Sequence, residues 1–198
     1  MTLPEFPRSS AVAIIPYQTS WPQEYEQIAS QLSAVLQDAV LRIDHIGSTS
    51  VPGLSAKDII DIQITVANLD DTVYQERLNA SSFVFRGANR DNFIDIPDEH
   101  SPELRKCYAR EIPGQKRTHI HIREHGRLNQ RYALLFRDYL RASDPSRLAY
   151  QTIKERLAIL FPESIEGYLY IKDPVMDLMY VAAESWATQT HWEIGPRH

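Results

Sequence analysis

The stretch DHIGSTSVPGLSAKDIIDIQITV, residues 44–66, combines a turn of small residues with a β-branched run. Its segment GSTS, residues 47–50, consists of small residues whose backbone N–H groups and hydroxyls can surround an anion, because no bulky side chain blocks the approach. The VPG segment, residues 51–53, predicts a turn, since proline fixes one φ angle and glycine frees the next. The β-branched run 59–66 then predicts a strand whose side chains alternate between two faces. Asp61 and Gln63 are expected on its polar face.

Length and composition predict one globular domain. The chain has 198 residues, of which 43% are hydrophobic and 24% charged, and no segment approaches the roughly 20 consecutive apolar residues of a membrane span. The start of the chain lacks the apolar core of a signal peptide, and a single cysteine, Cys107, cannot form an intramolecular disulfide. We therefore expect a cytoplasmic protein without a membrane partner. The net charge of -5 argues against non-specific binding of nucleic acid.

The expected domain covers residues 11–187, between a loose N-terminal segment (1–10) and a loose tail (188–198). Its first half alternates strands and helices. We expect strands at 11–17, 41–46 and 83–86, and helices from Trp21 to about Val40, with Ser20 as its N-cap, and over 70–80. Residues 87–101 are expected to form a long loop, either a lid or a plain connection.

The second half begins with a predicted β-hairpin and ends in helices. Strands over 104–112 and 117–123 flank a Pro-Gly turn, and Cys107 is expected in the core. Apolar residues at helical spacing predict a helix from Leu128. Asp-Pro pairs at 144–145 and 173–174 predict two further helix starts. In the first of these helices the expected buried stripe is Ala149, Ile153, Leu157 and Leu160. The order of elements indicates an α+β fold with helices packed on a mixed sheet.

The run HIGSTSVPGLSAKDIIDIQI, residues 45–64, with Trp21-Pro22 upstream and FRDYLR (136–141) downstream, closely resembles the GrpB-like family. The resemblance covers roughly residues 14–186. Members of this family look like divergent relatives of the nucleotidyltransferase superfamily, which implies a sheet of that type. The superfamily pattern is a Gly-Ser turn, an Asp-hydrophobic-Asp strand and a third carboxylate on a later strand. Here Gly47-Ser48 and Asp61 fit this pattern, whereas Gln63 stands at the position of the second carboxylate.

Asp61 is the first candidate site residue. A carboxylate beside a phosphate-sized turn could hold Mg²⁺ or Mn²⁺, which would clamp a polyphosphate and neutralise developing charge. The alternative is an aspartate that only pairs with a neighbouring lysine or arginine.

His119 and His121 are the second candidates, because residues i and i+2 of a strand point to the same side. With a carboxylate nearby, two imidazoles suit Zn²⁺, Mn²⁺ or Fe²⁺ better than Mg²⁺. The alternative is that both histidines only bond their neighbours. His45 is open in the same way: it either orients a substrate or bonds the turn. Asp61 and His121 are the catalytic candidates, and Asp61, His119 and His121 the metal ligands.

The candidates for binding phosphate or nucleotide are small turn residues and basic side chains. They are Gly47, Ser48, Thr49, Ser50, Lys57, Arg137 and Lys172. The alternatives are that the hydroxyls only bond the backbone of the turn and that the charged side chains are only solvated. We expect Arg137 to reach the cleft while Asp138 forms a structural ion pair.

The leading hypothesis is a nucleotidyltransferase-like protein that binds a nucleotide or another phosphorylated small molecule and carries out metal-assisted nucleotidyl or phosphoryl transfer. One rival is a transition-metal enzyme that uses Asp61, His119 and His121. Another is a binding module without turnover. The resemblance adds that GrpB-like domains also occur fused to the coenzyme A pathway kinase.

Overall fold

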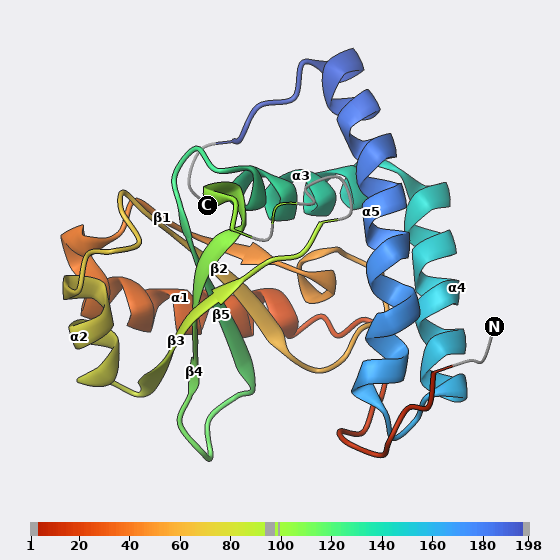
Figure 1. Cartoon of the computed structure of the whole chain (residues 1–198), viewed down its shortest axis with the longest axis horizontal. Coiled ribbons are helices and arrows are strands. Elements are labelled where there is room, and N and C mark those ends of the chain that lie inside the picture. Colours follow the sequence, from red (N-terminus) through yellow and green to blue (C-terminus); the bar gives the residue numbers. More distant parts are fainter. Residues whose placement is uncertain (1–3, 94–97, 99, 196–198) are drawn as a thin grey trace.

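The structure, a computed structural model, describes residues 4–93, 98 and 100–195. Five strands form one mixed sheet in the order β1-β2-β5-β4-β3 (Figure 1). The strands are β1 (Arg42–Ile46), β2 (Ile60–Val66), β3 (Phe83–Arg90), β4 (Arg105–Glu111) and β5 (Thr118–Glu124). The helices are α1 (Trp21–Leu36), α2 (Val73–Asn79), α3 (Leu128–Ala142), α4 (Asp144–Leu160) and α5 (Ile165–Thr190). Short 3₁₀ turns lie at Gln37–Ala39, Ser48–Ser50 and Pro102–Leu104. The predicted α+β class is confirmed.

The main core lies between one face of the sheet and the helices α1 and α2. The isoleucines of β2 and β5 and the apolar stripe of α1 form one buried cluster, with α2 contributing Tyr74 and Leu78. Isoleucines at every second position of the strands therefore pack against apolar residues at helical spacing in α1. A second core packs α3 and α5 around Tyr132 and Leu135, and α4 and α5 run side by side beyond one side of the sheet (Figure 1).

The central pair of strands is parallel. Strand β2 pairs with β5 so that Asp61 lies opposite His119 and Gln63 lies opposite His121. Strand β1 pairs with β2 in the antiparallel sense, and the predicted hairpin is confirmed as the antiparallel pair β4–β5. The register therefore brings Asp61 and both histidines to one part of the sheet.

The expected polar face of β2 is not a solvated one. Gln63 and Thr65 are completely buried, and the Gln63 side-chain amide donates to the backbone carbonyl of Gln130 in α3 at 3.0 Å. Helix α3 covers this face, so β2 is buried on both sides, as is usual for a strand with a parallel neighbour.

Three expectations for the first half are wrong. Residues 11–17 form no strand beyond an isolated bridge between Ile15 and Ala56. Ser20 donates to the Glu24 carboxylate and does not cap the backbone of α1. Residues 87–90 belong to β3, which continues past an irregularity at Gly87. The rest of the predicted lid includes residues 94–97 and 99, which lie outside the described residues.

Two expectations for the C-terminal helices are also wrong. Asp173-Pro174 starts no helix, because α5 begins at Ile165, after Ser164 caps the Gly167 N–H, and continues through Pro174. A proline inside a helix costs about 3 kcal/mol, and buried Tyr168 and Tyr180 on either side of it hold the helix together. The buried stripe of α4 is Tyr150, Lys154 and Leu157, whereas Leu160 is exposed.

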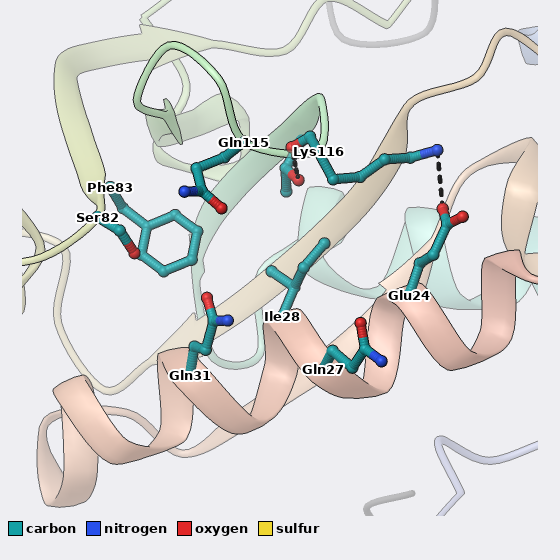
Figure 2. Close-up of a pocket in the computed structure, with 9 residues that line it drawn as sticks. Glu24, Gln27, Ile28, Gln31, Ser82, Phe83, Gln115 and Lys116 are labelled. Atoms are coloured by element: carbon teal, nitrogen blue, oxygen red, sulfur yellow. Dashed lines mark hydrogen bonds and ion pairs between the residues drawn. The ribbon is translucent and has the colours of Figure 1, made fainter.

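The terminal segments contact the body of the protein where they are described. Phe6 packs against Phe161 and Tyr170, and the Trp192 indole donates to Asp138 at 3.1 Å. Near α1, a small cavity of about 110 Å³ lies beside the β4–β5 connection, where Lys116 forms an ion pair with Glu24 (Figure 2). Among the described helices, none is long and apolar enough to cross a membrane.

Candidate functional site

The Gly-Ser turn lies directly against Asp61. Gly47 has a φ of +68°, and a Cβ atom added there would lie 2.8 Å from the Asp61 Cβ and closer still to its Oδ2. Only glycine combines this backbone angle with this close approach. The Ser50 hydroxyl donates to the Gly47 carbonyl at 2.6 Å. The turn thus fixes the place of the Asp61 carboxylate.

His45 has a structural role in this turn. Its ring stacks on Tyr25 with centroids 4.6 Å apart, and its Nε2 lies 3.0 Å from the Thr49 hydroxyl. Burial lowers the pKa of His45 to about 3, although the charge of Asp61 opposes the shift. His45 is therefore neutral near pH 7 and bonds the turn, as one of the two interpretations of the sequence has it.

Asp61, His119 and His121 come together on the face of the sheet below α3. The Asp61 Oδ1 lies 3.5 Å from the His119 Nδ1 and 3.7 Å from the His121 Nε2. One ligand atom from each residue fits within a 4.8 Å group. These N···O distances exceed those of good hydrogen bonds, and they resemble the separation of two ligands that share one ion about 2.1 Å from each. The geometry therefore suits a cation between the three side chains.

The protonation states also suit a metal. Burial would raise the pKa of Asp61, but the neighbouring imidazoles of His119 and His121 hold it well below its usual range. Burial lowers the pKa of His121, with partial compensation from Asp61, and the buried His121 Nδ1 has no hydrogen-bond partner among the described residues. An ionised carboxylate beside a neutral imidazole is the state in which these groups bind a metal.

Gln63, at the position of a second carboxylate, belongs to a different network. Its carbonyl oxygen accepts from Arg123 at 2.7 Å, and the Arg123 Nε donates to Asp91 at 2.9 Å. Lys106 and Asn129 also contact Asp91. Gln63 thus holds Arg123 and the start of α3, and it is not free to ligate a second ion.

A cavity of about 580 Å³ lies between the sheet, α3, α4 and α5, and Asp61, His119 and His121 line it. Its described lining holds seven Lys or Arg residues and four aspartates, in a chain of net charge -5. The cations are Lys57, Arg90, Lys106, Arg123, Arg137, Lys154 and Lys172, and the anions Asp61, Asp91, Asp173 and Asp177. The lining is thus basic relative to the whole chain and favours an anionic ligand.

The structure brings most of the predicted phosphate-binding residues to this cavity. Gly47, Ser48, Thr49, Lys57, Arg137 and Lys172 all line it, but Ser50 does not. The Arg137 guanidinium donates to the His45 carbonyl and forms an ion pair with Asp138. Arg137 thus reaches the cavity wall but spends its donors on the protein, whereas Lys57 makes no ion pair within the described residues and lies 5.8 Å from the centre of the Tyr168 ring.

Lys154 is the site residue that the sequence pattern missed. It lies on the buried side of α4, and its Nζ is 2.9 Å from the Ser48 Oγ and 2.5 Å from the Ser55 carbonyl. A lysine in a helix normally lies on the side of the helix that faces solvent. Its spacing from Tyr150 and Leu157, i+4 and i−3, is the signal that could have placed it inward.

The geometry defines an α+β protein with a His-His-Asp group beside a Gly-Ser turn and a basic cavity. The chain belongs to the GrpB family: the family model described as "GrpB protein" matches residues 11–181. The crystal structure of conserved protein GrpB from Enterococcus faecalis is similar, with a TM-score of 0.72 and 29% identity over 88% of this chain and 99% of that one.

Relatives of known sequence are of two kinds. A protein of Halalkalibacterium halodurans named UPF0157 protein BH1888 is 31% identical over 86% of this chain and 81% of its own length. A protein of Mycobacterium tuberculosis (strain H37Rv) named dephospho-CoA kinase is 32% identical over 90% of this chain but only 47% of its own length. The chain spans about half the length of the first curated relatives that it matches.

Proposed function

We propose that this protein binds a phosphorylated small molecule, with nucleotides as the candidate class, beside one transition-metal ion held by Asp61, His119 and His121, and that it acts on a phosphate bond of that ligand. The observation that carries the proposal is the His-His-Asp group at the wall of a basic cavity. Two imidazoles and one carboxylate favour Zn²⁺, Mn²⁺ or Fe²⁺ over Mg²⁺, which prefers oxygen ligands.

The Gly-Ser turn followed by Asp61 on the next strand supports a nucleotidyltransferase-like arrangement of the site. A metal at this place would polarise a phosphoryl oxygen. Ser48 and Lys57 would orient the phosphate, and His45 would hold the turn through Thr49. Because Gln63 is bonded to Arg123 and α3, the proposal needs one ion and not the carboxylate-bridged pair of a two-metal mechanism.

The longer relatives suggest a ligand class without assigning an activity. Dephospho-CoA kinase is a name given to proteins of which this chain matches about half. This chain has no G-x-x-x-x-G-K-[ST] sequence, the loop that cradles phosphates in P-loop kinases. We infer that the kinase activity named for those relatives does not come from the part that this chain matches, and that coenzyme A precursors are worth including among the ligands tested.

Thermal unfolding tests the proposal. Wild type, Asp61→Asn and Asp173→Asn are compared against nucleotides and coenzyme A precursors, each with Zn²⁺, Mn²⁺, Mg²⁺ or no metal. Asp173 is the matched control, since it lines the same cavity but pairs with Lys172. A ligand at 100 times its Kd stabilises by about 2.7 kcal/mol, which raises the midpoint by roughly 5–10 °C.

The proposal predicts that a phosphorylated ligand with Zn²⁺ or Mn²⁺ raises the midpoint of wild type and Asp173→Asn but not of Asp61→Asn. A turnover assay on that ligand follows, with water and small alcohols as acceptors. If metal and ligand together stabilise Asp61→Asn as much as wild type, Asp61 holds no metal and the proposal fails.

A further inference from the structure

Lys154 is a buried cation without a counter-ion in the part of the chain that the structure describes. Only 2% of the residue is exposed, and its ammonium faces two neutral oxygens, the Ser48 hydroxyl and the Ser55 carbonyl. The ring of Tyr150 lies 4.9 Å away. Removing an ammonium from water is costly unless an opposite charge compensates it, so a charged Lys154 needs an anion from outside the chain.

Charged side chains on α4, α5, β2 and the loop before β2 act on Lys154. Lys172 on α5 and Lys57 before β2 repel its charge, whereas Glu155 on α4 and Asp61 on β2 favour it. Tyr150 and Tyr168 add neutral rings that line the same cavity. Burial first and Lys172 second lower the pKa of Lys154 to about 7. The lysine is therefore largely neutral at mildly alkaline pH.

We propose that Lys154 and Ser48 form the subsite that recognises a doubly charged phosphate group, and that the binding of this dianion brings a proton onto Lys154. The proton comes from solvent: a neutral amine, one proton and the dianion become an ammonium paired with the dianion. The inference rests on the proposed function, because it describes recognition in the same cavity.

The two contacts of Lys154 leave it able to serve this role. An ammonium carries three N–H donors, and Ser48 Oγ and the Ser55 carbonyl accept from two of them, which leaves one for a ligand. While it accepts from Lys154, the Ser48 hydroxyl can donate its own hydrogen to the same ligand. A terminal phosphate dianion fits this subsite better than a carboxylate, since two negative charges also offset Lys57 and Lys172.

Sulfate binding to metal-free protein tests the subsite. Sulfate is the probe because it keeps both charges throughout the neutral pH range, so any proton taken up must bind to the protein. Isothermal titration calorimetry with EDTA present, in two buffers of different ionisation enthalpy, gives the number of protons bound per sulfate. We expect between half a proton and one at pH 8.5 for wild type, and close to none at pH 5.5, where Lys154 is already charged.

Three variants separate Lys154 from the other cations. Lys154→Met should weaken sulfate binding about ten- to a hundredfold at pH 5.5 and abolish proton uptake at pH 8.5. Lys154→Arg should bind sulfate without proton uptake, because arginine is always charged. Lys106→Met is the control: Lys106 lines the same cavity but pairs with Asp91, so this variant should keep the uptake.

Three results overturn the inference: wild type binds sulfate at pH 8.5 without taking up a proton, folded Lys154→Met takes up as many protons as wild type, or wild type binds no sulfate at tens of millimolar. No metal is present, so these failures are distinct from a failure of Asp61 to hold an ion. Far-UV circular dichroism shows whether each variant is folded.

Discussion

Replacing Gly47 by alanine tests the close contact between the Gly-Ser turn and Asp61, one of the three proposed metal ligands. Gly47 has a φ of +68° and a ψ of −173°, a backbone conformation essentially restricted to glycine, and alanine there costs about 1–3 kcal/mol. The new methyl group would also lie 2.8 Å from the Asp61 Cβ, well inside van der Waals contact, and overpacking of this kind costs about 1–3 kcal/mol. The free energy of unfolding should therefore fall by about 2–6 kcal/mol. Asp61 should also move, which lowers metal affinity by about tenfold or more.

Gly53→Ala is the matched control for this substitution. Gly53 has a φ of +79°, but an added Cβ would meet nothing within 4 Å. It should lose only the backbone contribution of about 1–2 kcal/mol and keep wild-type metal affinity. Urea unfolding followed by circular dichroism gives the stabilities, and competition with a chromophoric zinc chelator gives the affinities. Equal losses for the two variants would refute the close approach of Gly47 to Asp61.

Two further predictions concern buried titratable groups near the site. Asp91→Ala leaves Arg123 and Lys106 without the carboxylate that they share, so urea unfolding should show a loss of about 3–5 kcal/mol; a loss below 1 kcal/mol would contradict the network. The pKa of His45, about 3 in the folded protein, lies below the value of about 6.5 in an unfolded chain, so protonation favours unfolding. The stability that depends on neutral His45 is complete above pH 6.5 and falls by up to about 1.4 kcal/mol per pH unit towards pH 3. His45→Gln should flatten this part of the stability profile, and an unchanged slope would show that His45 does not titrate in this way.

The arrangement of β2 and β5 could be predicted in part because alternation along a strand is local. The sequence placed His119 and His121 on one side of their strand, and the structure confirms this. Their meeting with Asp61 depends on the parallel register of β2 and β5, which is a tertiary property. Only the family resemblance, and no local pattern, indicated that the two strands lie together.

The burial of the β2 face that α3 covers could not be predicted, because this face contains polar residues. Gln63 and Thr65 are fully buried, and the α3 backbone and Arg123 satisfy Gln63. A polar residue on a strand normally indicates solvent. Lys154 was missed for a related reason, because its burial depends on oxygens that the turn and the following loop supply from about 100 residues earlier in the chain.

The predicted helix start at Asp173-Pro174 is wrong because local sequence and tertiary packing favour different structures there. Asp173-Pro174 has the local features of a helix start, but buried residues on both sides of the proline keep α5 continuous. Asp144-Pro145 has the same features and does begin α4. The difference is tertiary: α5 packs along both α3 and α4, and no window of a few residues contains that information.

A titration with Zn²⁺ shows directly whether Asp61, His119 and His121 hold one metal ion. Competition with a chromophoric chelator is measured for wild type, Asp61→Asn, His121→Gln and the control Asp173→Asn. We predict one tightly bound ion per chain for wild type and Asp173→Asn, and an affinity at least about tenfold lower for the other two variants. If folded Asp61→Asn and His121→Gln bind Zn²⁺ with wild-type affinity and stoichiometry, these side chains do not ligate the ion.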